Sequence, residues 1–356
     1  MIEAREVIFI VPNNEIGGAQ NFLKRLFNNI SLTRKSFITE DLVSYGSFNF
    51  FNRVWKIYKK VKAINGKVIV LATVNSMISS SVCKLFFNNF FLVSRVGNTL
   101  SAETKIKNFH YYRLIFLHKF IFWVSDLIVF QSKAMKQDVL EVVKRKDSSK
   151  YIVINNGIDF GEISFKSGQE IKSIINNDYF NFILLGSFKY QKAYDVFLEA
   201  IKLISQDSIA QMKFYICGGN AFEEKVFEEF KDGLEENNLD KYVNLMGWTT
   251  NPYPLMKAMD AYILPSRYEG FPNSLIEALS LGLPSIVSRS PGANEEIITN
   301  RFNGLTFENE NAKDLSNQIL TLKDNRGSFN SVDIINDIKQ RYDIDKIADQ
   351  YKNLFK

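Results

Sequence analysis

The chain is poor in cysteine and histidine. Its 356 residues include only two cysteines, Cys83 and Cys217, and two histidines, His110 and His118. The cysteines lie far apart in apolar surroundings, which predicts reduced core thiols and excludes a disulfide framework. Neither histidine stands at metal-ligand spacing from a cysteine, so we expect no metal site.

Long apolar runs are also absent. No stretch approaches the roughly 20 apolar residues that a membrane-spanning helix needs. The segment 1–12 carries Glu3, Arg5 and Glu6 before a short apolar run, which predicts a first strand and no secretory signal. We therefore expect a cytoplasmic protein that is soluble or peripheral to a membrane.

Positive charge is unevenly distributed. The net charge is +5, but residues 1–160 hold 23 Lys and Arg against 11 Asp and Glu, whereas the remainder holds 21 against 28. The length fits two domains. The first is expected to be basic and to have an anionic partner, such as a phosphorylated substrate, an anionic lipid or a nucleic acid.

The most informative stretch is 259–288. It predicts a strand, a loop rich in turn-forming residues, a helix and a second strand. Glu269 lies in the loop, and Glu277 lies about one turn inside the helix. A helix N-terminus favours anions, so we expect a phosphate site there with carboxylates beside it to accept hydrogen bonds from sugar hydroxyls. An ordinary capped helix is the alternative. We expect the backbone amides of Asn273, Ser274 and Leu275 to bind the phosphate. Asn273 and Ser274 are also the candidate N-cap residues of the helix.

Strand and helix patterns alternate along the chain. This alternation predicts an α/β protein with parallel sheets covered on both faces, whose ligands bind at the carboxyl ends of the strands. Arg95 and Asn98 follow such a strand and are candidate ligand-binding side chains, with a solvated loop as the alternative. Gly17 and Gly18 separate the first strand from a helix, which lets the backbone approach a ligand, although a plain tight turn has the same pattern.

The segment 105–124 mixes basic residues with a dense run of aromatics. For residues 109–113 we favour an interfacial helix that contacts lipid. For residues 114–124 we favour a core helix packed against the sheet. Binding of single-stranded nucleic acid is the rival interpretation, but no RNA-binding motif accompanies the segment.

Residues 266–278, Ser-Arg-Tyr-Glu-Gly-Phe-Pro-Asn-Ser-Leu-Ile-Glu-Ala, closely resemble the signature of retaining glycosyltransferases of family 4, which have the two-domain GT-B fold. Residues 155–159, Asn-Asn-Gly-Ile-Asp, are similar to the element at which that family crosses to its second domain. Lys192 matches a phosphate-binding lysine of the family, whereas Ser187 stands where arginine is usual and Ala193 where glycine is usual. The resemblance covers nearly the whole chain.

This resemblance implies two Rossmann-like, doubly wound parallel-sheet domains that face an interdomain cleft. The acceptor-binding domain is expected at residues 1–160 together with 340–356, which would form a returning C-terminal helix. The nucleotide-sugar-binding domain is expected at 161–339, entered through a polar connector within 160–178.

The resemblance also implies residue roles. Glu269 and Asn98 would act at the donor sugar as the catalytic residues, and Glu277 would bind the ribose. The turn at Gly247 and Trp248 would lie over the base. Trp248 could stack there or simply pack, and packing is the expectation. The diphosphate and sugar are assigned to Gly17, Gly18, Ser187, Lys192, Gly270, Phe271, Pro272, Asn273, Ser274 and Leu275. The acceptor or the interdomain region is assigned to Arg95 and Asn156. With Ser187 in place of arginine, one phosphate contact is either missing or supplied elsewhere, with Lys189 and Arg267 as the candidates.

The expected function is transfer, with retention, of a hexosyl or N-acetylhexosaminyl group from a nucleotide sugar, expected to be a UDP-sugar. The expected acceptor is a polyprenyl-diphosphate-linked saccharide in O-antigen or capsule assembly. No metal or other cofactor is expected. The expected setting is the cytoplasmic face of the inner membrane, with its anionic surface as a partner and no nucleic acid. The alternatives are a soluble sugar synthase of the same fold that uses a free sugar, and a non-catalytic GT-B-like or nucleic-acid-binding protein.

Overall fold

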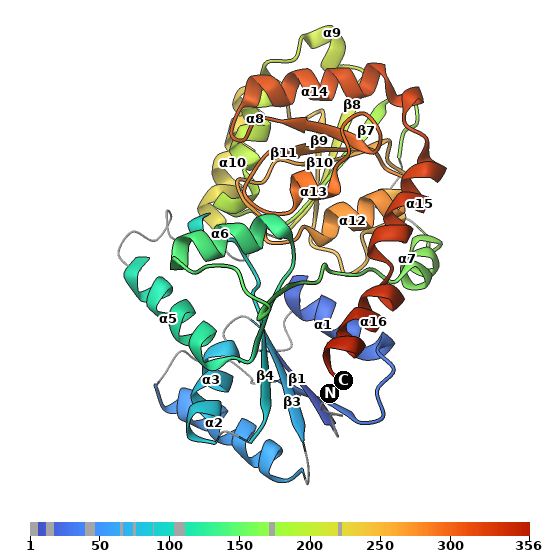
Figure 1. Cartoon of the computed structure of the whole chain (residues 1–356). Helices are drawn as coiled ribbons and strands as arrows, with labels where there is room; N and C mark the ends of the chain where they lie inside the picture. The colour runs from blue at the N-terminus through green and yellow to red at the C-terminus, as the bar shows by residue number, and fades with distance from the viewer. Residues whose placement is uncertain are drawn as a thin grey trace. The chain divides into compact units, whose positions relative to one another are not determined.

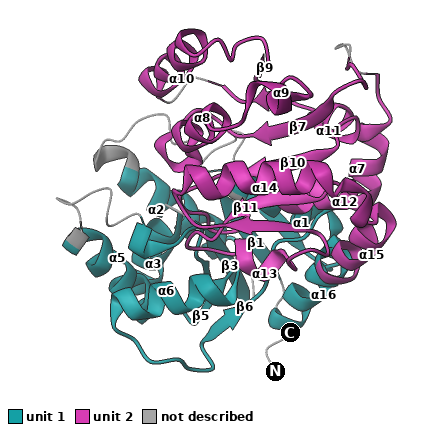
Figure 2. Ribbon diagram, turned by 90° about the horizontal axis from the view of Figure 1, so that it is seen from above, with its two compact units in different colours: residues 1–158, 342–356 teal, residues 159–341 magenta. Residues whose placement is uncertain are grey.

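The chain forms two compact units. Figure 1 shows a computed structural model, which describes residues 6–11, 18–39, 47–64, 67–73, 76–87, 89–102, 111–170, 175–219 and 223–356. Unit 1 comprises residues 1–158 and 342–356, and unit 2 comprises residues 159–341 (Figure 2). Each unit is described by itself below.

Unit 1 is built on a six-stranded sheet in the order β2-β1-β3-β4-β5-β6, and its strand pairs are parallel. Its strands are β1 Glu6–Val11, β2 Lys35–Thr39, β3 Val68–Thr73, β4 Phe91–Arg95, β5 Leu127–Phe130 and β6 Tyr151–Val153. Its helices are α1 Gly18–Asn29, α2 Ser47–Lys62, α3 Ser76–Phe86, α5 Tyr111–Val124, α6 Lys133–Val143 and α16 Ile344–Leu354.

Side chains of β1 alternate between two apolar cores, as the two-residue period of a strand requires. Val7, Phe9 and Val11 pack in a cluster with residues of α1 and α16. Ile8 and Ile10 pack in a second cluster, with residues of α2, α3, α5 and α6. Helices therefore cover both faces of the sheet, and α2, α3 and α5 belong to one helical layer.

The C-terminal helix returns to unit 1. Asp343 ends α15 (Ser331–Tyr342) and caps α16, because its carboxylate accepts a hydrogen bond from the Asp345 amide at 3.0 Å. Ile158 N donates to the Tyr342 carbonyl, and Ile344 N donates to the Ile158 carbonyl, each at 2.9 Å. The chain after residue 330 thus forms two helices, because it becomes extended at Asp343.

Unit 2 carries a second six-stranded sheet in the order β12-β11-β10-β7-β8-β9, and its strand pairs are also parallel. Its strands are β7 Phe180–Leu185, β8 Met212–Cys217, β9 Val243–Gly247, β10 Ala261–Leu264, β11 Ser285–Ser288 and β12 Gly304–Phe307. Its helices are α7 Phe160–Ser167, α8 Tyr194–Lys202, α9 Gln206–Ile209, α10 Glu224–Glu236, α11 Tyr253–Lys257, α12 Asn273–Ser280, α13 Asn294–Ile297, α14 Ala312–Asp324 and α15, with 3-10 turns η2 Tyr190–Lys192 and η3 Arg326–Ser328.

The strand order of unit 2 reverses between β7 and β10. The chain runs outward from β7 to β9, then returns to the other side of β7 and runs outward again through β10 to β12. Ligands of open α/β sheets bind at the carboxyl ends of strands where the order reverses. The loops after β7 and β10 are therefore the natural place for a site in this unit.

The prediction of two Rossmann-like parallel-sheet domains is confirmed. The first residues of the expected connector at 160–178 form α7, which is capped by the Asp159 carboxylate on the Glu162 amide. In the described residues of the 105–124 segment, α5 begins at Tyr111. No helix in the described ranges is long and apolar enough to span a membrane.

Candidate active site

Glu269 and Lys192 form an ion pair where the strand order of unit 2 reverses. Lys192 ends the loop after β7, and Glu269 lies in the loop after β10. Lys192 Nζ lies 2.6 Å from Glu269 Oε1, and the two side chains are 20% and 9% exposed. Gln191 Nε2 donates to the Tyr268 carbonyl at 3.0 Å and lies 3.5 Å from Glu269 Oε2. Two residues that lie 77 positions apart thus share one polar cluster.

The backbone around Glu269 is held closely. Its amide donates to the Pro291 carbonyl at 2.9 Å. Gly292 has φ +127°, and a Cβ added there would overlap the Glu269 carbonyl group. Only glycine combines this conformation with so close an approach. The sequence prediction did not include Gly292, although its place after β11, the strand beside β10, is a signal that could have found it.

The loop after β7 positions Lys192. Gly186, with φ +151°, lies under the aliphatic part of the lysine, and a Cβ added to it would be 3.0 Å from Lys192 Cε. Ala193, with φ 52°, is in the left-handed region where the family resemblance expects glycine. Ser187 is partly exposed. The lysine is thus directed along the glycine and toward Glu269.

Arg267 is not available to replace the missing arginine at position 187. Its guanidinium binds Asp195 through two hydrogen bonds of 3.0 and 2.5 Å, Glu310 at 2.7 Å and the Tyr190 carbonyl at 2.8 Å. Burial lowers the pKa of Arg267, but its hydrogen bonds to Asp195 and Glu310 raise it above the ordinary value. The expectation that Arg267 binds phosphate is therefore wrong, because its donors already hold the loop together.

Lys189 remains a candidate for the phosphate contact that Ser187 does not supply. Burial lowers the pKa of its ammonium, the nearby Glu223 raises it, and the nearby Lys192 lowers it. Lys189 and Lys192 both follow β7 and lie three positions apart in the chain, so two lysines belong to the loop at the carboxyl end of this strand. Gathered cations suit a polyanionic ligand.

Helix α12 begins earlier than the sequence predicts. Its N-cap is Pro272, which has no side chain that could accept the amide hydrogen bond, so neither Asn273 nor Ser274 acts as the cap. Leu275 N donates to the Pro272 carbonyl at 3.0 Å, which removes it from the amides expected to bind phosphate. Asn273 and Ser274 occupy the first turn of α12, the positive end of the helix dipole.

Tyr262, on β10, is fully buried and reaches the start of α12. Its hydroxyl donates to Ser274 Oγ at 2.8 Å. Burial raises the pKa of Tyr262 well above its usual range, the bond to Ser274 lowers it, and the charges of Glu269 and Glu277 raise it further. Glu269 and Glu277 therefore both lie near this phenol. Gly270, Phe271 and Pro272, between Glu269 and α12, are buried.

The turn after β9 adjoins the turn after β8. Gly218 N donates to the Gly247 carbonyl at 3.0 Å, and Gly247 has φ +69°. A Cβ added at Gly219 would be 3.6 Å from Trp248 Cβ. Trp248 is 60% exposed, so the expectation that it packs into the protein is wrong. Its indole is instead accessible for stacking.

Arg95 in unit 1 does not line an open site. It is fully buried, because it follows Val93 by two residues and so lies on the face of β4 that α1 and α16 cover. Its Nε donates to Tyr351 Oη at 3.1 Å, its Nη2 donates to Asn156, and its guanidinium lies 4.4 Å from the Phe22 ring. The prediction that Arg95 reaches into a binding cleft is therefore wrong, and Asn156 is buried with it.

The remaining predicted residues of unit 1 are placed in part. Gly18 is the first residue of α1, whereas Gly17 lies outside the described residues. Asn98 is partly exposed beyond the carboxyl end of β4, and its Oδ1 accepts a hydrogen bond from the Thr99 amide at 3.1 Å.

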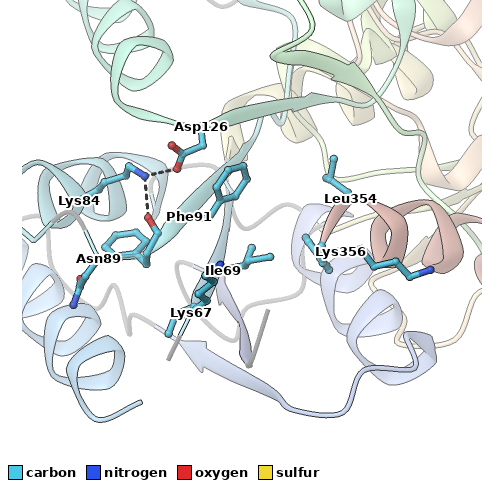
Figure 3. A pocket seen from close by; sticks show the side chains of 11 residues that line it. Lys67, Ile69, Lys84, Asn89, Phe91, Asp126, Leu354 and Lys356 are labelled. Carbon is cyan, nitrogen blue, oxygen red and sulfur yellow. Dashed lines mark hydrogen bonds and ion pairs between the residues drawn. The ribbon is translucent and has the colours of Figure 1, made fainter. Parts of the chain in front are cut away.

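A cavity of 490 Å³ lies elsewhere in unit 1, at the amino ends of β3 and β4, where Val68 and Phe91 line it (Figure 3). Lys84 in its wall donates to Asp126 and, at 2.9 Å, to the Phe90 carbonyl. The ammonium is thus already neutralised. This cavity is at the edge opposite to the carboxyl ends of the strands and contains none of the predicted site residues.

Comparisons with known proteins show what the chain is similar to. Residues 167–341 match the family model described as "Glycosyl transferases group 1". An Escherichia coli protein named UDP-Gal:alpha-D-GlcNAc-diphosphoundecaprenol alpha-1,3-galactosyltransferase is 28% identical over 59% of this chain and 54% of its own length. A Campylobacter jejuni protein named N-acetylgalactosamine-N,N'-diacetylbacillosaminyl-diphospho-undecaprenol 4-alpha-N-acetylgalactosaminyltransferase is 24% identical over 68% of this chain and 62% of its own length. The chain thus spans less than two thirds of these relatives.

Among solved structures, Anabaena Alr3699/HepE in complex with UDP and glucose superposes with a TM-score of 0.79 at 16% identity, covering 99% of both chains. The lipopolysaccharide outer core galactosyltransferase WaaB superposes with a TM-score of 0.73 at 16% identity, covering 98% of this chain and 99% of that one. Identities this low establish the fold alone. The chain has the two-domain GT-B fold, and its residues 167–341 match the family of group 1 glycosyl transferases.

Proposed function

We propose that the chain is a retaining glycosyltransferase of family 4. It transfers a hexosyl or N-acetylhexosaminyl group from a nucleotide sugar, preferably UDP-linked, to a polyprenyl-diphosphate-linked saccharide. The observation that carries this proposal is the ion pair of Lys192 and Glu269 beside the first turn of α12. A cation, a carboxylate and helix amides at one point match a ligand that carries both phosphates and hydroxyls.

The donor is assigned to unit 2. Lys192, helped by Lys189 and the first-turn amides of α12, neutralises the diphosphate. Once Lys192 engages phosphate, Glu269 is free to accept hydrogen bonds from the donor sugar. Glu277, inside α12, takes the ribose, and the exposed Trp248 takes the base by stacking.

The transfer step needs charge stabilisation more than a covalent nucleophile. The bond between the anomeric carbon and the diphosphate oxygen breaks, and a bond from the same carbon to the acceptor oxygen forms on the same face. The acceptor hydroxyl proton passes to the departing phosphate oxygen. Lys192 stabilises the negative charge on the leaving group without a metal ion. Asn98 in unit 1 is assigned to the donor sugar from the family resemblance.

The acceptor is assigned to unit 1. The charge excess of residues 1–160 suits a diphosphate-linked substrate, and the two named relatives act on diphosphoundecaprenol-linked saccharides by their names. We place the reaction in O-antigen or capsule assembly at the cytoplasmic face of the inner membrane. The anionic lipid surface there is a further partner.

A panel of nucleotide sugars tests the proposal. We expect one of them, preferably UDP-linked, to raise the melting temperature and to release its nucleotide when a diphosphoundecaprenol-linked saccharide is added. NMR of the product should show the anomeric configuration of the donor, and EDTA should not reduce the rate. Transfer to a free sugar alone, inversion, or no nucleotide binding would each contradict the proposal. Glu269→Gln should reduce this transfer strongly, and Glu229→Gln, at an exposed glutamate of α10, is the matched control that should leave it unchanged.

A further inference from the structure

The exposed large apolar side chains of unit 1 gather on three neighbouring helices. Every such residue described in this unit belongs to α2, α3 or α5. These helices cover one face of the sheet, and α3 contacts both α2 and α5 (Figures 1 and 2). We call the outer side of this layer the basic aromatic face. It is defined by Phe51, Trp55, Lys56, Lys59 and Lys62 of α2, Leu85 and Phe86 of α3, and Tyr112, Phe116, Lys119 and Trp123 of α5.

The aromatic residues of α5 form a stripe. Tyr112, Phe116, Lys119 and Trp123 follow the spacing i, i+4, i+7 and i+11, which places them along one side of a helix. Phe116 is 71% and Trp123 66% exposed. The opposite side of α5 enters the core through the buried Ile121 and Phe122, among others. The prediction of a core helix after residue 114 therefore holds for one side of α5 only.

A second stripe runs along α2. Phe51, Trp55 and Lys62 follow the same spacing, with Tyr58 between the last two. The Trp55 and Tyr58 rings are 5.1 Å apart, and the Tyr58 ring is 4.0 Å from that of Phe87, just after α3. The apolar surface of α2 thus continues onto the end of α3. Burying a large exposed ring stabilises association in proportion to its area.

Positive charge accompanies both stripes. The sequences of α2, α3 and α5 contain no Asp or Glu, and they carry five, one and two Lys or Arg residues. Lys59 Nζ lies 5.4 Å from the Trp55 ring, and Lys62 Nζ lies 5.4 Å from the Tyr58 ring. On the outer side of these helices, Lys60 Nζ lies 4.0 Å from Glu6 Oε1, and this is the ion pair found there within the described ranges.

We propose that the basic aromatic face docks this protein onto an anionic lipid bilayer. Rings enter the boundary between head groups and acyl chains, while the lysines beside them reach anionic head groups. The stripes of α2 and α5, together with Leu85 of α3, fit a bilayer surface. A single-stranded nucleic acid is usually bound on a platform or in a groove whose aromatics separate successive bases.

This inference deepens the proposed function, because a polyprenyl-linked acceptor is itself held in a membrane. It is nevertheless tested without an acceptor. The intact chain is sedimented with vesicles of pure phosphatidylcholine and with vesicles of an equimolar mixture of phosphatidylcholine and phosphatidylglycerol. We expect binding to the mixed vesicles and little to the neutral ones, with a strong decrease as salt is added.

Variants test whether the basic aromatic face is responsible for vesicle binding. Phe116→Ser with Trp123→Ser is expected to weaken binding at least about tenfold. Lys56→Ala with Lys59→Ala is expected to weaken it about fivefold per lysine on mixed vesicles only. All four side chains are exposed, so folding is expected to survive. The matched controls lie in unit 2: Phe165→Ser, at a residue 75% exposed, and Lys225→Ala with Lys231→Ala.

Tryptophan emission gives a second readout. Trp55 and Trp123 lie on the face, and Trp248, the third tryptophan of the chain, lies in unit 2. Mixed vesicles should shift the emission of Trp248→Phe to the blue and leave that of Trp55→Phe with Trp123→Phe unchanged. Absence of vesicle binding, equal losses in the control variants, or binding of an oligonucleotide in place of vesicles would overturn the inference. Sugar transfer that persists when vesicle binding fails would leave the proposed function intact.

Discussion

Lys192 Nζ and Glu269 Oε1 lie 2.6 Å apart, but the lysine side chain is 20% exposed and that of the glutamate 9%. The pair is therefore asymmetric. Lys192 can turn toward water if its partner is lost, whereas a carboxylate left alone at Glu269 stays largely buried. This asymmetry separates the effect of each residue on stability from its effect on catalysis.

Lys192→Met should lower the free energy of unfolding of unit 2 by about 1–3 kcal/mol, because it leaves a buried carboxylate without its cation. Glu269→Gln should lower it by less than about 1 kcal/mol. Both should reduce kcat/KM for sugar transfer by about a hundredfold or more. Urea unfolding and nucleotide-release assays measure the two effects.

The control is Lys166→Met on α7, whose ion pair with Glu162 at 2.5 Å has both side chains about one third exposed, 36% and 35%. It should change stability by less than about 0.5 kcal/mol and leave transfer unchanged. Equal stability losses for Lys192→Met and Glu269→Gln would contradict the asymmetry of the pair.

Three glycines of unit 2 should differ in a fixed order when changed to alanine. Gly327 has open space around it, Gly247 combines open space with φ +69°, and Gly292 combines φ +127° with overlap of the new Cβ on Glu269. We expect losses of about 0, 1 and more than 2 kcal/mol in the free energy of unfolding. Urea denaturation of the three variants measures the order, and a harmless Gly292→Ala would show that the loop around Glu269 moves freely.

Arg95→Met should destabilise unit 1 by about 1–3 kcal/mol. The change removes the donors to Tyr351 Oη and Asn156 within a core that water does not reach. Burial lowers the pKa of Arg95, while its contact with Tyr351 raises it, so Tyr351 is part of what holds the charge inside. A cycle with Tyr351→Phe should show a coupling of at least about 0.5 kcal/mol.

Arg145→Met, at an exposed position of the same unit, is the control and should lie within about 0.5 kcal/mol of the unchanged chain. Additive effects of Arg95→Met and Tyr351→Phe would mean that the hydrogen bond between them contributes nothing to stability.

The sequence predicts the fold because its signals are local. Apolar runs alternate with helical spacing throughout, and the two parallel sheets follow from that alternation. Glu269, Glu277 and Lys192 were found as site candidates by a family resemblance within short segments. Their proximity to one another depends on which strands are neighbours, and the sheet order decides that.

Other features depend on contacts between distant residues. Arg95 looked like a loop ligand because its partner Tyr351 comes 256 positions later, on a helix that returns to unit 1. Arg267 looked like a free cation because Asp195 and Glu310 lie 72 and 43 positions away. Neither spacing nor composition carries this information, since both residues are placed by tertiary packing.

The two cysteines should react very slowly with a thiol reagent in the folded chain. Burial raises the pKa of Cys83 to about 12 and that of Cys217 to about 11, from an ordinary value of 9.0. A raised pKa keeps the proton on the folded thiol, so at pH 8 the thiolate fraction falls about a thousandfold at Cys83 and about a hundredfold at Cys217. The same shifts mean that the stability contributed by these protonated thiols is complete below pH 9 and is lost as the pH rises toward 11 and 12.

Titration with a chromogenic disulfide at pH 8 should therefore show two slow thiols that become fast in denaturant, and Cys83→Ser should remove the slower one. A fast thiol in the folded chain would place that cysteine outside the core.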